Sequence, residues 1–199
     1  MHPNRIFRDD DRARHEALIR EHPFAVVFAR TPSGPRVAHT PVLSTGDGAL
    51  QFHLARGNAL TRHIEGRTVL ITFTGAHGYI SPRWYTGVDH VPTWNYSALE
   101  CEGPVRRMHE EGLLAFLEAF GDREEARIVE GVPWRMASVS EQAKSALLRG
   151  VVGFELEIAV RRETFKLSQK TPVEDRARVV DGLRKQGNPL LAEAMETPQ

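Results

Sequence analysis

Basic and amide side chains recur in this sequence where predicted strands end. Arg56 and Asn58 follow one such strand in the string HLARGN and lead directly into a short predicted helix. A guanidinium presents two parallel N–H donors to a phosphate, and the first amides of a helix add further donors. Ser81 ends another strand in YISPRW, and Lys166 and Gln169 stand near the end of the last one in FKLSQ. These residue types favour binding of an anion such as a phosphate.

Aromatic residues crowd into the segment from His77 to Tyr96. It holds all three tyrosines and two of the three tryptophans, although aromatic residues are only 8% of the chain. Pro82 and Pro92 lie among them, and prolines indicate ordered loops rather than the centre of a packed strand. Rings near phosphate-type donors suit a pocket with apolar walls and few polar anchors. We therefore expect a flat, conjugated, phosphorylated ligand; the alternative is that each basic side chain merely keeps a strand end soluble.

The histidines leave three interpretations open. Five of the nine lie between His39 and His90. They can stand singly on solvated faces, converge on a metal ion, or line a ligand site, with His39 and His53 facing each other across a hairpin. No His-x-x-x-His or Cys-x-x-Cys spacing supports a metal site, so none is predicted. A Gly-x-Ser-x-Gly motif is missing, and Cys101 is expected to be a small buried residue, so no catalytic residue is assigned.

The composition bounds the class of protein. The chain has 199 residues, of which 41% are hydrophobic, enough for a real core. Its 26 basic and 26 acidic side chains cancel, so no overall positive field favours binding to nucleic acid. A single cysteine excludes an internal disulfide, which fits a reducing compartment. Because the sequence has neither an apolar signal segment nor a run of about 20 apolar residues, we expect a cytoplasmic protein without membrane spans.

Short β-rich segments separated by turn residues must position these groups. In one of them, Leu50, Phe52 and Leu54 alternate with less apolar residues, as in a sheet with one buried face. Tight turns join such segments, and regular strand–helix alternation and dinucleotide or P-loop motifs are absent. We therefore predict a mainly β fold, an antiparallel barrel of about six strands with flanking helices. The strands are expected over residues 24–30, 36–44, 49–56, 67–75, 97–108 and 151–169, and helices over 9–21, 57–64, 109–121 and much of 122–150.

The C-terminal tail is predicted to be helical. A capping-box pattern begins at Thr171, and Val179 and Leu183 supply an apolar stripe at helical spacing. We therefore divide the chain into a barrel domain over residues 1–170 and a helical tail over 171–199 that packs on the same domain.

Five strings of this sequence resemble a known family. AHTPV, FHLARGNAL, GYISPRWY, VPTWNY and FKLSQ occur in this order and at suitable intervals. They resemble the PaiB-type, FMN-binding negative transcriptional regulators, within the FMN-binding split-barrel class that includes pyridoxamine-phosphate oxidases and flavin reductases. The similarity runs from the first predicted helix to the tail, so it covers nearly the whole chain.

The resemblance implies a six-stranded antiparallel split β-barrel that forms a homodimer, with FMN in a groove at the subunit interface. By class analogy, the phosphate contacts would be Arg56 and Lys166, helped by Ser81 and Gln169. The residues near the isoalloxazine or ribityl chain would be His39, Thr40, Pro41 and Leu54, and the walls of the site would be Tyr79, Ile80, Trp84 and Trp94.

Three functions stay open at this point. The first is that of an FMN-binding transcriptional regulator acting indirectly, because the neutral charge and the lack of a basic helix-turn-helix argue against direct DNA contact. The second is an FMN-dependent oxidoreductase that uses NADH or NADPH, with FMN carrying the redox chemistry. The third is a binding protein for another flat ligand such as haem.

Overall fold

Seven β-strands form the framework of the computed structural model, which describes residues 2–196. The strands are β1 (Phe24–Thr31), β2 (Gly34–Ser44), β3 (Ala49–Ala55), β4 (Thr68–Ile80), β5 (Thr93–Arg107), β6 (Val151–Glu157) and β7 (Val160–Lys166). The α-helices are α1 (Arg12–Glu21), α2 (Glu110–Glu125), α3 (Glu141–Gly150), α4 (Val173–Lys185) and α5 (Pro189–Glu196), and the 3-10 turns are η1 (Arg5–Phe7), η2 (Pro82–Trp84) and η3 (Met136–Ser138). None of the described helices is long and apolar enough to span a bilayer.

The strands pair in the order β4-β1-β2-β3-β6-β5-β7, and β4 also pairs with β5. Six strands thus form a closed cycle of pairings, and β7 is added at β5. The prediction of a mainly antiparallel sheet with flanking helices is confirmed, and the structure has one strand more than the six that the family resemblance implies. The segment 151–169 was expected as one strand and forms two, because the backbone turns at Ile158 and Ala159 to hydrogen-bond with the carbonyls of Gly48 and Glu102.

The chain divides into two compact units, and β4, β5 and β7 each contain residues of both. The first unit consists of the described residues up to Leu18, Phe73–Glu100 and the described residues from Arg162 onward. The second unit consists of Ile19–Thr72 and Cys101–Arg161.

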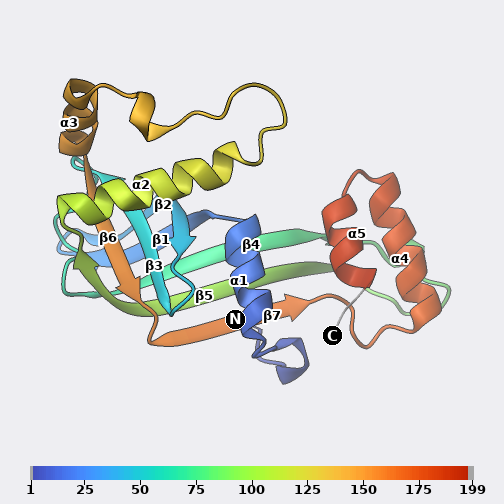
Figure 1. Cartoon of the computed structure of the whole chain (residues 1–199). Coiled ribbons are helices and arrows are strands. Elements are labelled where there is room, and N and C mark those ends of the chain that lie inside the picture. The colour runs from blue at the N-terminus through green and yellow to red at the C-terminus, as the bar shows by residue number, and fades with distance from the viewer. Residues whose placement is uncertain (1, 197–199) are drawn as a thin grey trace. The chain divides into compact units, whose positions relative to one another are not determined.

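The second unit is packed on both faces of its sheet, with Phe52 and Phe154 on one face and α2 against the other. Phe52 of β3 pairs with Phe154 of β6, and their rings stack 5.6 Å apart in full burial. Helix α2 lies across β3 and β6 (Figure 1) and buries Leu113 and Phe116. Gly153 of β6 permits this close approach, because a Cβ there would lie 3.1 Å from the Leu113 side chain.

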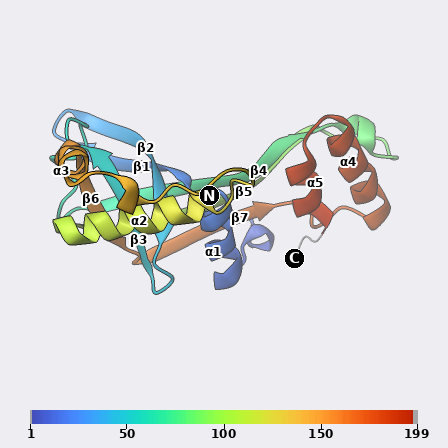
Figure 2. The same ribbon diagram turned by 45° about the horizontal axis from the view of Figure 1, so that its top comes forward.

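The first unit pairs one sheet face with the two C-terminal helices. Helices α4 and α5 pack side by side (Figures 1 and 2) and bury Val179, Leu183 and Met195. At Gly78 of β4 an added Cβ would lie 2.6 Å from the Asn188 amide nitrogen, which donates a hydrogen bond of 3.0 Å to the carbonyl of His77. The helices therefore cover the face of β4 to which Gly78 belongs.

Candidate functional site

Three exposed aromatic rings gather on β4 and β5 in the first unit, and we call them the ring cluster: His77, Tyr79 and Trp94. The His77 and Trp94 rings stack with centroids 6.0 Å apart, and Tyr79 meets Trp94 edge-on at 6.5 Å. Alternation explains their exposure, because Gly78 and Ile80 of β4 are buried and successive side chains of a strand point to opposite faces. The ring cluster is therefore on the face that α4 and α5 do not cover.

Exposure of this size needs an explanation. Tyr79 is 49% exposed and Trp94 is 50% exposed. Large amphipathic rings gathered on a surface mark a place where a ligand or a partner binds. The ring cluster is thus a candidate wall for a flat ligand.

Lys166 lies next to the ring cluster. Its ammonium donates a 2.9 Å hydrogen bond to the carbonyl of Trp94 and another to the Thr93 hydroxyl. Burial lowers the pKa of the Lys166 ammonium below its usual value. Since a lysine ammonium has three N–H donors, these two bonds leave one donor for an anion.

The other predicted site residues of the first unit have structural partners. Ser81 caps η2 by accepting a 3.2 Å hydrogen bond from the amide of Arg83. Ile80 is fully buried, and the Trp84 ring packs on Gly182 of α4. The Gln169 amide folds back on its own segment, accepting a bond from the Leu167 amide and donating one to the Phe165 carbonyl. Their roles in ligand binding stay predictions.

The loop that connects β4 to β5 is fastened to α4 by a carboxylate that sequence analysis missed. Asp175 accepts hydrogen bonds of 2.8 Å from the Thr86 hydroxyl and 3.1 Å from the Thr86 amide. These bonds lower the pKa of the Asp175 carboxyl. In the same loop the Tyr85 and His90 rings stack 4.4 Å apart. The sequence feature that could have indicated a role for Asp175 is its place in the first turn of the predicted C-terminal helix, where a negative charge is favoured.

Arg56 in the second unit directs its guanidinium to the end of α3. Its Nε donates a 2.6 Å hydrogen bond to the Arg149 carbonyl, and the contact of Nη2 with the Val151 carbonyl is longer, at 3.4 Å. The side chain is otherwise exposed, and a guanidinium has five N–H donors. Arg56 can therefore still bind an anion.

The short helix expected over residues 57–64 is a series of turns. Asn58 explains this, because its side-chain oxygen accepts a 2.9 Å hydrogen bond from the Leu60 amide. An asparagine that binds the backbone two residues on favours a turn over a helix. The helix amides expected beside Arg56 are therefore not arranged as a helix N-terminus.

The predicted residues of β2 and β3 fall on different sides of the sheet. On one face, His39 is exposed and stacks on Phe24 at 6.1 Å, and the ring of His53 lies 5.8 Å from that of Phe116 in α2. Thr40 is buried and its hydroxyl donates a 2.7 Å hydrogen bond to the carbonyl of His53. The two histidines thus have different ring partners. Of the remaining two predicted residues, Pro41 is half-buried and Leu54 is buried.

Arg56 belongs to the second unit and Lys166 to the first. Their joint contact with one phosphate stays a prediction. Within residues 2–196, no group of three or more histidine, cysteine, aspartate or glutamate side chains is placed to hold a metal ion.

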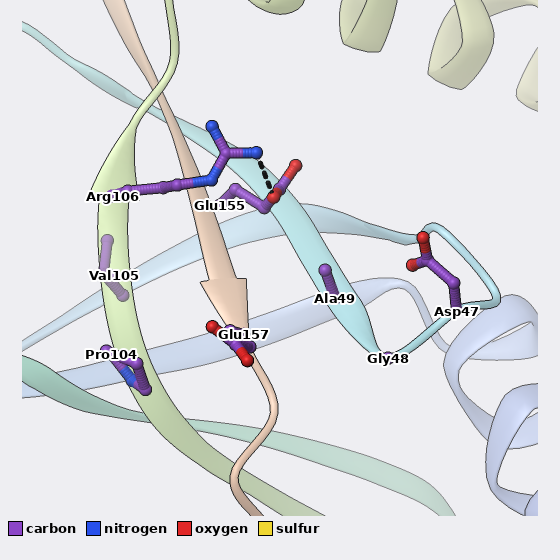
Figure 3. Close-up of a pocket in the computed structure, with 8 residues that line it drawn as sticks. All are labelled: Asp47, Gly48, Ala49, Pro104, Val105, Arg106, Glu155 and Glu157. Atoms are coloured by element: carbon purple, nitrogen blue, oxygen red, sulfur yellow. Dashed lines mark hydrogen bonds and ion pairs between the residues drawn. The ribbon is translucent and has the colours of Figure 1, made fainter.

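A pocket of about 310 Å³ in the second unit is chemically unlike a flavin site (Figure 3). Its charged lining residues are Asp47, Glu155, Glu157 and Arg106, and the guanidinium of Arg106 is paired with Glu155. Gln51 donates a further 2.8 Å hydrogen bond to Glu155. The carboxylates of Asp47 and Glu157 thus leave this pocket with a net negative charge, and its lining has no aromatic ring. A phosphorylated ring compound would therefore be repelled there.

Comparison with known proteins identifies the family of this chain. Residues 1–160 match the family described as "Putative FMN-binding domain". The chain belongs to this family. It is also 30% identical over 186 residues to the protease synthase and sporulation protein PAI 2 of Bacillus subtilis, covering 90% of this chain and 88% of that protein. The predicted PaiB-type resemblance is therefore confirmed, and FMN, the predicted cofactor, is the one named in the family's description.

Two solved structures share the fold at low identity. The FAD and heme binding protein of Mycobacterium smegmatis has a TM-score of 0.64 and 18% identity, over 85% of this chain and 78% of that one. The flavocytochrome Anf3 of Azotobacter vinelandii has a TM-score of 0.65 and 16% identity, over 89% and 78%. At these identities the likeness shows the fold.

Proposed function

We propose that this chain binds FMN with the isoalloxazine against the ring cluster and the phosphate held by basic side chains, Lys166 foremost. The observation that carries the proposal is an exposed group of aromatic side chains next to a lysine. The Lys166 ammonium donates a hydrogen bond to the backbone carbonyl of Trp94, one of these aromatic residues. Rings supply apolar contact area and the ammonium supplies a charged donor, which is the combination that a phosphorylated tricyclic ligand needs. Family membership supports the same ligand.

The residues of this chain have distinct tasks in such a site. His77 and Tyr79 contact the Trp94 ring and fix its position. The aromatic surface is therefore in place before the ligand binds. Lys166 provides positive charge for the phosphate, and Arg56 is the second basic side chain that the family resemblance assigns to it. FMN, when bound, supplies the redox chemistry, while the protein determines its orientation and electrostatic environment.

A second copy of the chain covers the flavin in this proposal, as the family resemblance implies. The half-exposed Tyr79 and Trp94 support this, because a ligand stacked on them would still present one face to water. Burying that face against a partner removes further apolar area from solvent. A homodimer with flavin at its interface is therefore the proposed assembly.

The ring cluster can be tested with matched tryptophan variants. In Trp94→Leu we expect quenching of FMN fluorescence to require roughly 5- to 150-fold more FMN, because an aromatic contact with a flat ring is worth about 1–3 kcal/mol. Trp134→Leu is the control, since Trp134 lies in the second unit and packs on Gly121 of α2. Equal FMN affinity in wild type and Trp94→Leu would show that the ring cluster is not part of the FMN site.

The regulatory role is proposed as an indirect one. PAI 2 is described as a protease synthase and sporulation protein, and the formal net charge of this chain is zero. Binding to DNA draws mainly on phosphate neutralisation. A gel-shift titration at moderate salt should show no sequence-selective complex with promoter fragments, and a selective complex would establish direct action instead.

An FMN-dependent oxidoreductase is the second candidate. It is favoured by the fold shared with a flavocytochrome and with an FAD and heme binding protein. Oxidation of NADH or NADPH by the FMN-loaded protein, followed at the nicotinamide absorbance, separates this enzyme from a passive binder. A Soret band after incubation with haem would instead favour the third candidate, a haem-binding protein.

A further inference from the structure

A small apolar pocket of about 190 Å³ lies in the second unit between β3, α2 and α3. Leucine, methionine and valine side chains form most of its wall, and only two of its residues carry polar side-chain groups. It is lined by His53, Leu114, Leu117, Met136, Lys144, Leu147, Leu148 and Val151.

His53 is the polar group on the strand side. Its Nδ1 is buried without a hydrogen-bond partner among the described residues. Burial lowers the pKa of the His53 imidazole below its usual value, so the ring is neutral at pH 7. An N–H buried without an acceptor costs more than an unused lone pair, which favours the tautomer with hydrogen on Nε2. His53 therefore contributes a neutral ring with one available N–H donor.

Lys144 is the polar group on the helix side. Its ammonium lies 2.8 Å from a carboxylate oxygen of Glu141, one turn earlier in α3. Lys144 is only 17% exposed, whereas Glu141 is 88% exposed. The lysine stem thus lies among apolar side chains. Among the described residues its charge is paired only with the solvated Glu141 carboxylate, and an ion pair with an exposed partner contributes little to stability.

We propose that this pocket binds a small monocarboxylic acid with an apolar body, such as an aryl or short acyl carboxylate. The carboxylate would take the place of the Glu141 carboxylate on the Lys144 ammonium, with the N–H of His53 as a second donor. The apolar body would contact Leu114, Leu117 and Leu148. An apolar cavity of about 150 Å³ is large enough to bind benzene, so a pocket of about 190 Å³ suits a ligand of roughly benzoate size and is too small for FMN.

The proposal is independent of flavin binding, because every lining residue belongs to the second unit while the ring cluster belongs to the first. The probes are benzoate and benzyl alcohol, which share the ring and differ in charge. We expect the full-length protein to bind benzoate with a Kd on the order of 1 mM or below, measured by NMR chemical-shift titration.

Three variants separate charge from shape. Lys144→Met should weaken benzoate binding about tenfold and leave benzyl alcohol within roughly twofold, since only the charge-assisted contact is lost. Glu141→Gln should strengthen benzoate binding, because the competing carboxylate is removed. Leu147→Trp, at an exposed position of the pocket rim, should fill the pocket and abolish binding of both probes while the circular dichroism spectrum stays unchanged.

Two results would overturn the proposal. One is no saturable shift with benzoate in wild type. The other is benzoate binding that is equally strong in wild type, Lys144→Met and Leu147→Trp, which would place the ligand elsewhere on the molecule.

Discussion

A single buried nitrogen makes His53 a pH-sensitive residue. Burial lowers its pKa in the folded chain, so on acidification the unfolded chain takes up a proton first, near the ordinary value of about 6.5. The neutral His53 ring therefore makes its full contribution to the free energy of unfolding above about pH 6.5. This contribution decreases as pH falls from there toward the lowered pKa of His53 in the folded chain.

We expect His53→Gln to flatten this dependence. Between about pH 7.5 and pH 5.5, the urea midpoint of wild type should fall more than that of the variant, because glutamine does not titrate. Other histidines contribute equally to both proteins, so the difference isolates His53. A parallel fall in the two proteins would show that the His53 ring is protonated as easily in the folded chain as in the unfolded one.

The composition of the segment from His77 to Tyr96 directed attention to its rings, but the sequence did not indicate their partners. The crowding of rings beside prolines predicted a flat ligand, and the family resemblance implied Tyr79 and Trp94 as walls of its site; the structure exposes both side chains. The acceptors for Lys166 lie 72 and 73 residues earlier in the chain, and no local pattern encodes such a contact. Gln169 turns back because Ser168 adopts a positive φ of 61°, which is uncommon outside glycine and unpredictable from sequence.

Among the structural elements, α4 depends on a close contact with η2. A Cβ at Gly182 would lie 2.5 Å from the Trp84 ring. Gly182→Ala gains about 1 kcal/mol of helix propensity, but overpacking a filled contact costs typically 1–3 kcal/mol. We therefore expect a net loss of stability and a shift in tryptophan emission, measured by thermal unfolding followed by fluorescence.

Gly150→Ala is the matched control for this prediction. Gly150 is also helical, at the end of α3, and nothing lies within 4 Å of its added Cβ. This variant should be as stable as wild type or slightly more stable. Equal behaviour of the two variants would mean that the Trp84 ring can move away without cost.

The Asp175 carboxylate is a second fastening of the loop between β4 and β5. We expect Asp175→Asn to weaken the bonds to Thr86, because hydrogen bonds to an ionised acceptor are the stronger ones. Limited proteolysis at neutral pH should then cut residues 82–92 faster than in wild type. Since bonding to Thr86 lowers the pKa of Asp175, the effect should be present above about pH 4 and fade as pH falls below that value.

Asp181→Asn is the control, because Asp181 is in the same helix and its carboxylate pairs with the exposed Lys185 and not with the loop residue Thr86. Unchanged cleavage of Asp175→Asn relative to this control would show that the loop is held by other contacts, such as that of Trp84.

Most elements were predicted correctly because turns and alternation are local. The strand over 151–169 was not, since its apolar residues continue the period-two pattern across the bend at Ile158, and the bend depends on pairing with distant carbonyls. The prediction of a helix over 57–64 was wrong for a local reason. The Asn58 side chain binds the Leu60 amide and favours a turn, although the neighbouring residues favour a helix.

For the whole molecule, the family strings predicted the fold and the cofactor, and both are confirmed. The two proposed phosphate ligands lie in different units. Lys166 also lies beyond the residues that match the family, which end at 160. That both residues hold one phosphate therefore stays a prediction, because no local pattern in the sequence relates residues so far apart.

Recognition of the phosphate is tested most directly by comparing FMN with riboflavin, which has the same ring and no phosphate. In fluorescence titrations, Lys166→Met should weaken FMN binding roughly 10- to 150-fold, as expected for a charge-assisted contact of about 1.5–3 kcal/mol. Riboflavin binding should change by no more than roughly twofold. Equal affinity of wild type for FMN and riboflavin, or an equal loss for both ligands in Lys166→Met, would contradict a phosphate held by this lysine.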